Sequence, residues 1–137
     1  MSSLENTLAV ATIAATLACT PVFAQDSGTL KKIKDSGVIS LGHRESSIPF
    51  SYYDDKQQVI GYSHEFMLKA VEAIKADQKL AKLDVKLMPV TPANRITLIQ
   101  NGTIDIECGS TTNNTERQKQ AAFSNTIFVI GTKLMAK

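Results

Sequence analysis

The stretch VISLGHRESS, residues 38–47, places a short apolar run directly before five polar residues. An apolar run of this length, preceded by a glycine, predicts a β-strand that is buried on both faces. Upstream, Leu30 and Ile33 have helical spacing, and Gly37 ends that helix. The order helix, buried strand, polar loop is typical of an α/β fold, in which ligands bind beyond the carboxyl ends of the strands.

Helical and strand patterns continue to alternate toward the C-terminus. Residues 49–61 predict a hairpin. A core-facing helix that Ser63 caps is predicted next, because apolar residues recur at helical spacing at Phe66, Met67, Ala70, Val71 and Ile74. The later elements are a strand with Val85 and Leu87, a helix opened by Thr91 and Pro92, a strand over 104–108, a helix from Thr115, and a last strand from 127 to 130. We expect an α/β domain with a mainly parallel sheet flanked by helices.

The first 24 residues differ from the rest of the chain. They contain a single charge, Glu5, and an almost unbroken apolar run that closes on VFA at 22–24. This pattern predicts a secretory signal peptide, although no Lys or Arg precedes the apolar run. The alternatives are an N-terminal anchor or a wrongly assigned start and, more weakly, a lipid-attachment cysteine at Cys19. We therefore expect an exported, periplasmic protein whose mature part is residues 25–137.

The mature part excludes several classes of protein. Its formal charge is about +3, and its densest basic stretch, residues 31–34, has no interleaved aromatic residue, which disfavours nucleic-acid binding. His43 and His64 are the only histidines, and no paired-cysteine, phosphate-loop or Gly-x-Ser-x-Gly pattern occurs. We expect no metal and no cofactor. Cys108 is the one cysteine outside the leader, so it is a thiol without an internal disulfide partner.

Arginines and hydroxyls stand at strand ends and helix starts. Arg44 follows the first strand, Arg95 opens a helix, and Arg117 lies at the start of the next helix. Ser110 and Thr112 follow the third strand two residues apart, so an extended backbone would point both the same way. Guanidinium groups bind carboxylates with two hydrogen bonds, and hydroxyls add donors. These five residues form a candidate site for an anion, although any one of the arginines, taken alone, is more often a surface ion-pair partner.

The chain resembles the family 3 periplasmic solute-binding proteins of ABC amino-acid importers. The resemblance rests on PFSY at 49–52, GYSHEF at 61–66, ECGSTT at 107–112, ER at 116–117 and AFS at 122–124. The stretches GHRESS at 42–47, NR at 94–95 and GSTTNN at 109–114 resemble the glutamate/aspartate-binding members in particular. The resemblance to the family spans about residues 29–137, nearly all of the mature chain.

This resemblance implies a type II periplasmic-binding-protein fold, in which two lobes close on an amino acid and deliver it to a membrane permease. It implies that Arg117 binds the α-carboxylate, that Ser110 and Thr112 serve the α-carboxylate and α-ammonium groups, and that Arg44 and Arg95 bind the side-chain carboxylate. Residues 25–137 would form the first lobe only. The chain departs from the pattern at Pro92, where acidic-ligand members carry a hydroxyl donor.

Two other readings stay open from the sequence. The chain could be a non-binding fragment of a split or truncated gene. It could also be an enzyme of the same fold, like the cyclohexadienyl dehydratases, which need a general acid in the cleft. Glu45 and Glu107 are the carboxylates placed to serve, and neither has an evident partner in the sequence. We expect a binding protein rather than an enzyme.

Overall fold

The computed structural model describes residues 28–131 and 133–136. The predicted leader, residues 1–24, lies outside the described residues. The helices and strands follow one another as α1 (Gly28–Ser36), β1 (Val38–His43), β2 (Ser46–Ser47), β3 (Ser51–Tyr53), β4 (Val59–Ile60), α2 (Tyr62–Asp77), β5 (Asp84–Pro89), α3 (Arg95–Gln100), β6 (Ile106–Glu107) and α4 (Thr115–Gln118).

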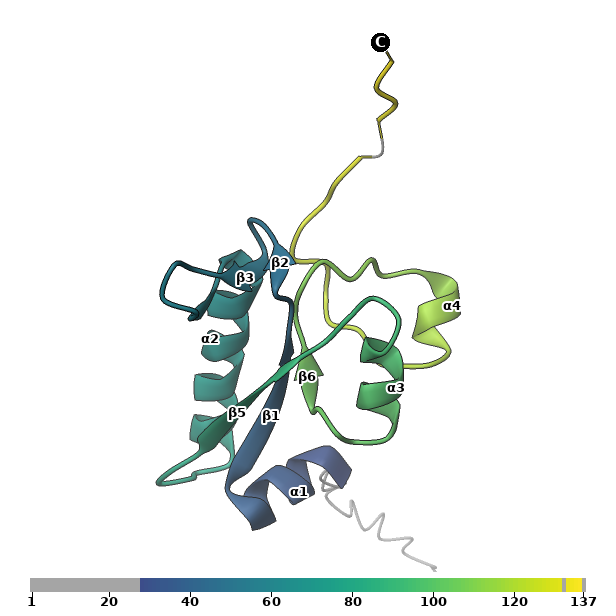
Figure 1. The fold of residues 1–137 in the computed structure, drawn as a ribbon. Coiled ribbons are helices and arrows are strands. Elements are labelled where there is room, and N and C mark those ends of the chain that lie inside the picture. The colour runs from purple at the N-terminus through teal and green to yellow at the C-terminus, as the bar shows by residue number, and fades with distance from the viewer. Residues whose placement is uncertain (1–27, 132, 137) are drawn as a thin grey trace, which may run out of the picture.

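Strand β1 lies at the centre of a parallel sheet with the order β5-β1-β6 (Figure 1). It pairs with β5 along its whole length and with β6 at Leu41 and Gly42. The excursion after β1 forms a second, antiparallel sheet, β2-β3-β4, beside the carboxyl end of β1. The predicted α/β fold with a mainly parallel sheet is therefore confirmed.

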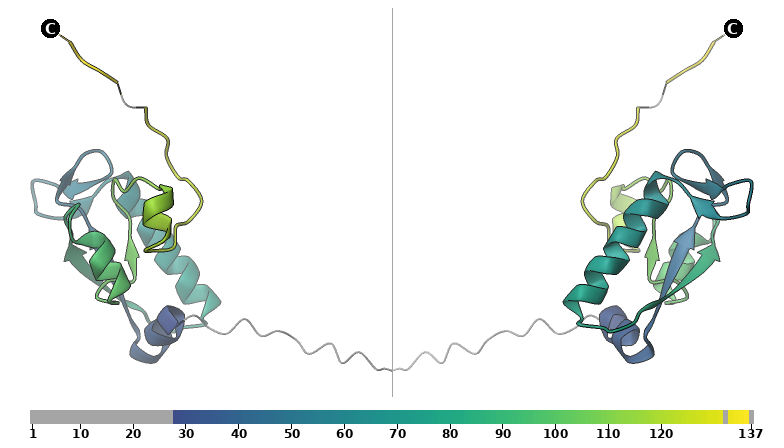
Figure 2. Two further views of the ribbon diagram at one scale, coloured as in Figure 1. Left: turned by 90° about the vertical axis from the view of Figure 1, so that its right-hand side faces the viewer. Right: turned by 90° about the vertical axis from the view of Figure 1, so that its left-hand side faces the viewer.

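The main core lies between β1 and helices α1 and α2. Ile39 and Leu41 lie two residues apart on β1, so both point to the same face of the sheet. There they pack against Ile33, Met67 and Val71. Burying one such side chain stabilises the fold by roughly 1.5–3 kcal/mol. Helices α3 and α4 lie on the opposite side of the sheet from α2 (Figure 2). The core therefore anchors β1 and leaves its carboxyl end free to carry polar groups.

Glycine is required where helix α2 begins. Gly61 has a φ of +120°, and a Cβ atom there would lie 2.6 Å from the carbonyl oxygen of Phe50. Gly61 is also the N-cap residue, so the prediction that Ser63 caps this helix is wrong. Ser63 lies inside the first turn, is buried, and donates its hydroxyl to the carbonyl oxygen of Gly109 at 2.9 Å. This bond ties α2 to the loop that follows β6.

Several expected apolar positions are more exposed than the sequence predicts. Phe66 is 46% exposed, because α2 turns Met67 and Val71 toward the sheet instead. Val85 and Leu87 are 40% and 41% exposed, since they lie on the edge strand β5. In the described part of the chain, no helix is long and apolar enough to cross a membrane.

The predicted last strand, residues 127–130, is wrong. This segment is irregular, and the chain beyond it runs away from the body of the domain (Figure 1). Its sequence has the apolar residues of a strand, but a strand also needs a neighbouring backbone to complete its hydrogen-bond ladder. Within residues 28–131 and 133–136, no strand pairs with this segment.

Candidate ligand-binding site

Three parallel strands end at one edge of the sheet and bring the predicted site residues there. The pairing of Gly42 with Glu107 places the loops after β1 and β6 side by side, and β5 leads from the same edge into α3. Arg44 follows β1, Arg95 is the first residue of α3, and Ser110 lies in the loop after β6. The arrangement matches the usual ligand position of open α/β sheets.

Neutral acceptors hold Arg44. Its Nε donates to Ser47 Oγ at 3.1 Å, and its Nη1 donates to the carbonyl oxygen of Val90 at 3.3 Å. The Ser110 hydroxyl donates to the same Ser47 oxygen at 3.5 Å. Ser47, which the sequence analysis did not include among the site residues, therefore joins Arg44 to Ser110.

Arg95 is the buried residue of α3, only 5% exposed, whereas the apolar Ile96, Leu98 and Ile99 of the same helix are half-buried. Its Nη1 donates to Thr111 Oγ1 and lies 3.5 Å from Glu107 Oε1. Burial lowers the pKa of Arg95, and the nearby carboxylate of Glu107 opposes this shift.

Helix α4 positions Arg117. The helix begins at Thr115, as the sequence predicts, and the side chain of Asn114 caps it by accepting from the Arg117 backbone N–H at 2.9 Å. The Arg117 Nη1 donates to the carbonyl oxygen of Thr112 at 2.9 Å. Arg117 and Arg44 both lower the pKa of Arg95 through their charges, so the three guanidinium groups share one electrostatic environment.

The loop from Gly109 to Thr112 lies among the three arginines. A Cβ atom at Gly109 would lie 2.7 Å from Arg44 Cγ and 2.8 Å from Glu107 Oε1, so only glycine fits between these side chains. Ser110 and Thr112 are exposed. Thr111, between them, is half-buried and donates to Glu107 Oε2 at 2.7 Å. The structure thus brings all five predicted residues around one loop.

Only one of the three arginines has a carboxylate partner in the described part of the chain. Arg95 is paired with Glu107, whereas no described carboxylate lies within 4.0 Å of Arg44 or Arg117. This role of Glu107 and Thr111 does not follow from the sequence. The alternation of Ile106 with Glu107 indicates that their side chains lie on opposite faces of the strand, but not that Arg95 packs against Glu107.

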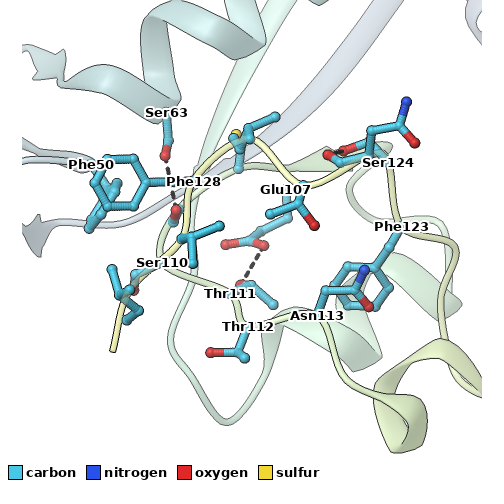
Figure 3. A pocket seen from close by; sticks show the side chains of 17 residues that line it. Phe50, Ser63, Glu107, Ser110, Thr111, Thr112, Asn113, Phe123, Ser124 and Phe128 are labelled. Carbon is cyan, nitrogen blue, oxygen red and sulfur yellow. Dashed lines mark hydrogen bonds between the residues drawn. The ribbon is translucent and has the colours of Figure 1, made fainter. Parts of the chain in front are cut away.

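A pocket of about 340 Å³ lies between this loop and residues 123–130 (Figure 3). Ser110, Thr111 and Thr112 line it together with Phe50 and Phe128, but none of the three arginines does. The three arginines of the candidate anion site therefore lie outside the lining of this pocket, whereas its two hydroxyl residues, Ser110 and Thr112, belong to it. Cys108 also lines the pocket, and burial raises the pKa of its thiol. No group of three metal-ligating side chains occurs among residues that the structure describes.

Curated proteins with similar sequences are amino-acid-binding proteins. The chain is 62% identical over 109 residues to the glutamate/aspartate import solute-binding protein of Escherichia coli K12, a match that covers 80% of this chain and 36% of that protein. It is 54% identical over 131 residues to the L-glutamate/L-aspartate-binding protein of Pseudomonas aeruginosa, covering 95% of this chain and 43% of that protein. The chain thus spans well under half the length of these relatives.

Solved structures with the same fold include an ancestral cyclohexadienyl dehydratase, with a TM-score of 0.63 and 26% identity over 72% of this chain and 38% of the other. They also include an arginine-bound form of domain 1 from TmArgBP, with a TM-score of 0.63 and 21% identity over 72% of this chain and 71% of the other. The sequence model of a protein family, the bacterial extracellular solute-binding proteins, family 3, matches residues 39–137 of the chain. The chain belongs to this family.

Proposed function

We propose that residues 25–137 form the first lobe of an exported glutamate/aspartate-binding protein that serves the permease of an ABC importer, with residues 1–24 as its signal peptide. One observation carries the choice of ligand: Arg44 and Arg117 lie at the ligand edge of the sheet without a carboxylate partner among the described residues. An acidic amino acid has two carboxylates to place against them. The names of the 54–62% identical relatives support the same ligand class.

In this proposal, each end of the ligand has its own partners. Arg117 binds the α-carboxylate, and the exposed hydroxyls of Ser110 and Thr112 serve the α-carboxylate and the α-ammonium group. Arg44 and Arg95 bind the side-chain carboxylate. Each hydrogen bond to a charged group is worth roughly 1.5–3 kcal/mol.

We expect the lobe alone to bind weakly. Ser110 and Thr112 are exposed and Arg44 is only half-buried, so water competes for their contacts with the ligand and screens the charges. A Kd near 1 mM corresponds to about −4 kcal/mol, which a few solvated contacts can supply. The arginine-bound single domain with this fold indicates that an experiment on one lobe is practicable.

Titration of the purified chain with glutamate, aspartate and glutamine, by calorimetry or NMR, tests the proposal. We expect both acidic amino acids to bind more tightly than glutamine. Arg44→Met should weaken the binding of glutamate by roughly tenfold or more, and the binding of glutamine much less. Lys34→Met, on the exposed face of α1, makes the same change of charge away from the site. It should change neither the affinity for glutamate nor the affinity for glutamine. If none of the three ligands binds at 50 mM, the chain is a non-binding fragment.

The contacts of Glu107 favour binding over catalysis. Glu107 was a candidate general acid, but its carboxylate accepts a hydrogen bond from Thr111 and pairs with Arg95, so it is occupied within the fold. Glu45, the other candidate, is exposed. Incubation with prephenate and with arogenate tests the dehydratase alternative: formation of product would establish an enzyme.

A further inference from the structure

A buried positive charge at the ligand edge needs an internal counter-ion. Arg95 is 5% exposed, and its Nε has no hydrogen-bond partner among the described residues. A guanidinium group removed from water in this way is costly unless a carboxylate lies close by. In the described chain, the only carboxylate within 4.0 Å of Arg95 is that of Glu107.

Glu107 is as buried as the charge that it faces. Its side chain is 8% exposed, and its Oε1 lies 3.5 Å from Arg95 Nη1. Thr111 connects the two groups, because its hydroxyl accepts from Arg95 Nη1 and donates to Glu107 Oε2. The hydrogen bond from Thr111 therefore fixes the carboxylate at Oε2, whereas Oε1 has no hydrogen-bond partner among the described residues and faces the charge of Arg95.

This ion pair lies inside the candidate site and changes its charge. Thr111, which closes the pair, stands between the exposed Ser110 and Thr112. Arg44 also approaches Glu107 across Gly109. With Glu107 present, the site has three guanidinium groups and one carboxylate, so two positive charges remain uncompensated. Two is also the number of carboxylates in glutamate or aspartate.

We propose that Glu107, held by Thr111, is a specificity-determining residue that compensates Arg95 and limits the uncompensated charge of the site to two. This inference rests on the proposed function and deepens it. Arg95 still donates hydrogen bonds, but Arg44 supplies the net charge that selects a side-chain carboxylate. The selectivity for glutamate over glutamine, which differ only at the end of the side chain, is therefore set by Glu107 together with the arginines.

Glu107→Gln tests this directly, with glutamate and glutamine titrated into the full chain. The variant keeps the shape of the side chain and adds one uncompensated positive charge. We expect the ratio of glutamate to glutamine affinity to rise roughly tenfold, because a unit charge a few ångströms away acts only on the charged ligand. Glu72→Gln, at an exposed position on α2, makes the same change of net charge and should leave the ratio unchanged.

A double-mutant cycle keeps the test informative if Glu107→Gln does not fold. Arg95→Gln alone leaves Glu107 uncompensated and should lower the ratio. The double variant with Arg95→Gln and Glu107→Gln removes both charges and should raise the ratio by about threefold or more above that of Arg95→Gln, although the lost contact of Arg95 keeps it below the original value. An identical ratio in Arg95→Gln and in the double variant, or an unchanged ratio in a folded Glu107→Gln, would show that Glu107 is only structural and overturn the inference. If the unmodified chain binds none of the ligands, the proposed function itself fails.

Discussion

Gly109 has no side chain at the point where Arg44 and Glu107 approach the backbone. We expect Gly109→Ala to push these two side chains apart and to destabilise the domain by about 1–3 kcal/mol, measured by urea unfolding. The same change should weaken glutamate binding, because Arg44 is displaced. Gly28→Ala is the control, since a Cβ atom there meets nothing within 4 Å. Equal stability of the two variants would contradict this reading of the loop.

His64 gives the domain a pH-dependent stability. It is buried on α2, and its Nδ1 has no hydrogen-bond partner among the described residues. Burial lowers its pKa, which the charge of Glu65 only partly opposes. The unfolded chain therefore takes up the proton more readily, so the contribution of neutral His64 to stability is complete above about pH 6.5 and is lost as the pH falls.

His64→Gln should therefore flatten the decrease in the free energy of unfolding between about pH 7 and pH 5. Urea unfolding at several pH values measures this decrease. The unmodified chain and the variant are compared at each pH, so that the carboxylates that titrate in the same range contribute equally to both. An unchanged slope in the variant would mean that His64 accepts its proton as easily in the folded state as in the unfolded chain.

At the residue scale, the sequence identifies charges but not their partners. Arg44, Arg95 and Arg117 stand out because each occupies a strand end or helix start, and the structure brings them around one loop. The pairing of Arg95 with Glu107 depends on how α3 packs against β6, which residue spacing does not encode. The half-burial of Thr111 between two exposed neighbours is equally a result of tertiary packing.

At the scale of elements, the segment 123–130 is attached to the domain by aromatic residues. Tyr62, at the start of α2, donates its hydroxyl to the carbonyl oxygen of Ile127 at 2.9 Å. The ring of Phe128 lies 5.0 Å from that of Phe50 and 5.9 Å from that of Tyr62, distances typical of aromatic pairs. These contacts hold the segment in place without a strand ladder.

Tyr62→Phe removes the hydroxyl and keeps the ring. We expect faster hydrogen exchange over residues 124–130, with at most about 1 kcal/mol lost from the free energy of unfolding. Tyr52→Phe is a matched control, because the Tyr52 hydroxyl makes no hydrogen bond to a described residue. If exchange over this segment is the same in both variants, the aromatic stacking alone holds it.

The elements that the sequence predicts well are those whose burial is decided locally. The apolar run of β1 and the Met67–Val71 spacing of α2 face each other across the core, so pattern and packing agree. Residues 127–130 have an equally apolar pattern, yet they form no strand, because a strand depends on a neighbouring backbone. Val85 and Leu87 are more exposed than their pattern predicts for a similar reason. Strand β5 lies at an edge of the sheet, and its sequence does not encode this position.

At the scale of the whole molecule, the open edge of the sheet exposes the site to salt. We expect the affinity for glutamate to fall roughly threefold to tenfold when NaCl is raised from about 10 mM to about 300 mM, because the screening length shortens to the size of the site. NMR titration measures this, with glutamine as the uncharged comparison. An affinity independent of salt would indicate that the arginines bind the ligand in a closed, dry environment.

The segment from Ser110 to Thr112 faces two ways, and we expect this to couple its exposed and its buried contacts mechanically. Its first and third hydroxyls are open to solvent, whereas the second is fastened to Arg95 and Glu107. A displacement of this backbone by a group bound outside would alter the geometry of the buried ion pair inside. Conversely, a change at the ion pair would reorient the outer hydroxyls. In the proposed function, the two regions bind opposite ends of one small molecule, and they would then respond together rather than separately.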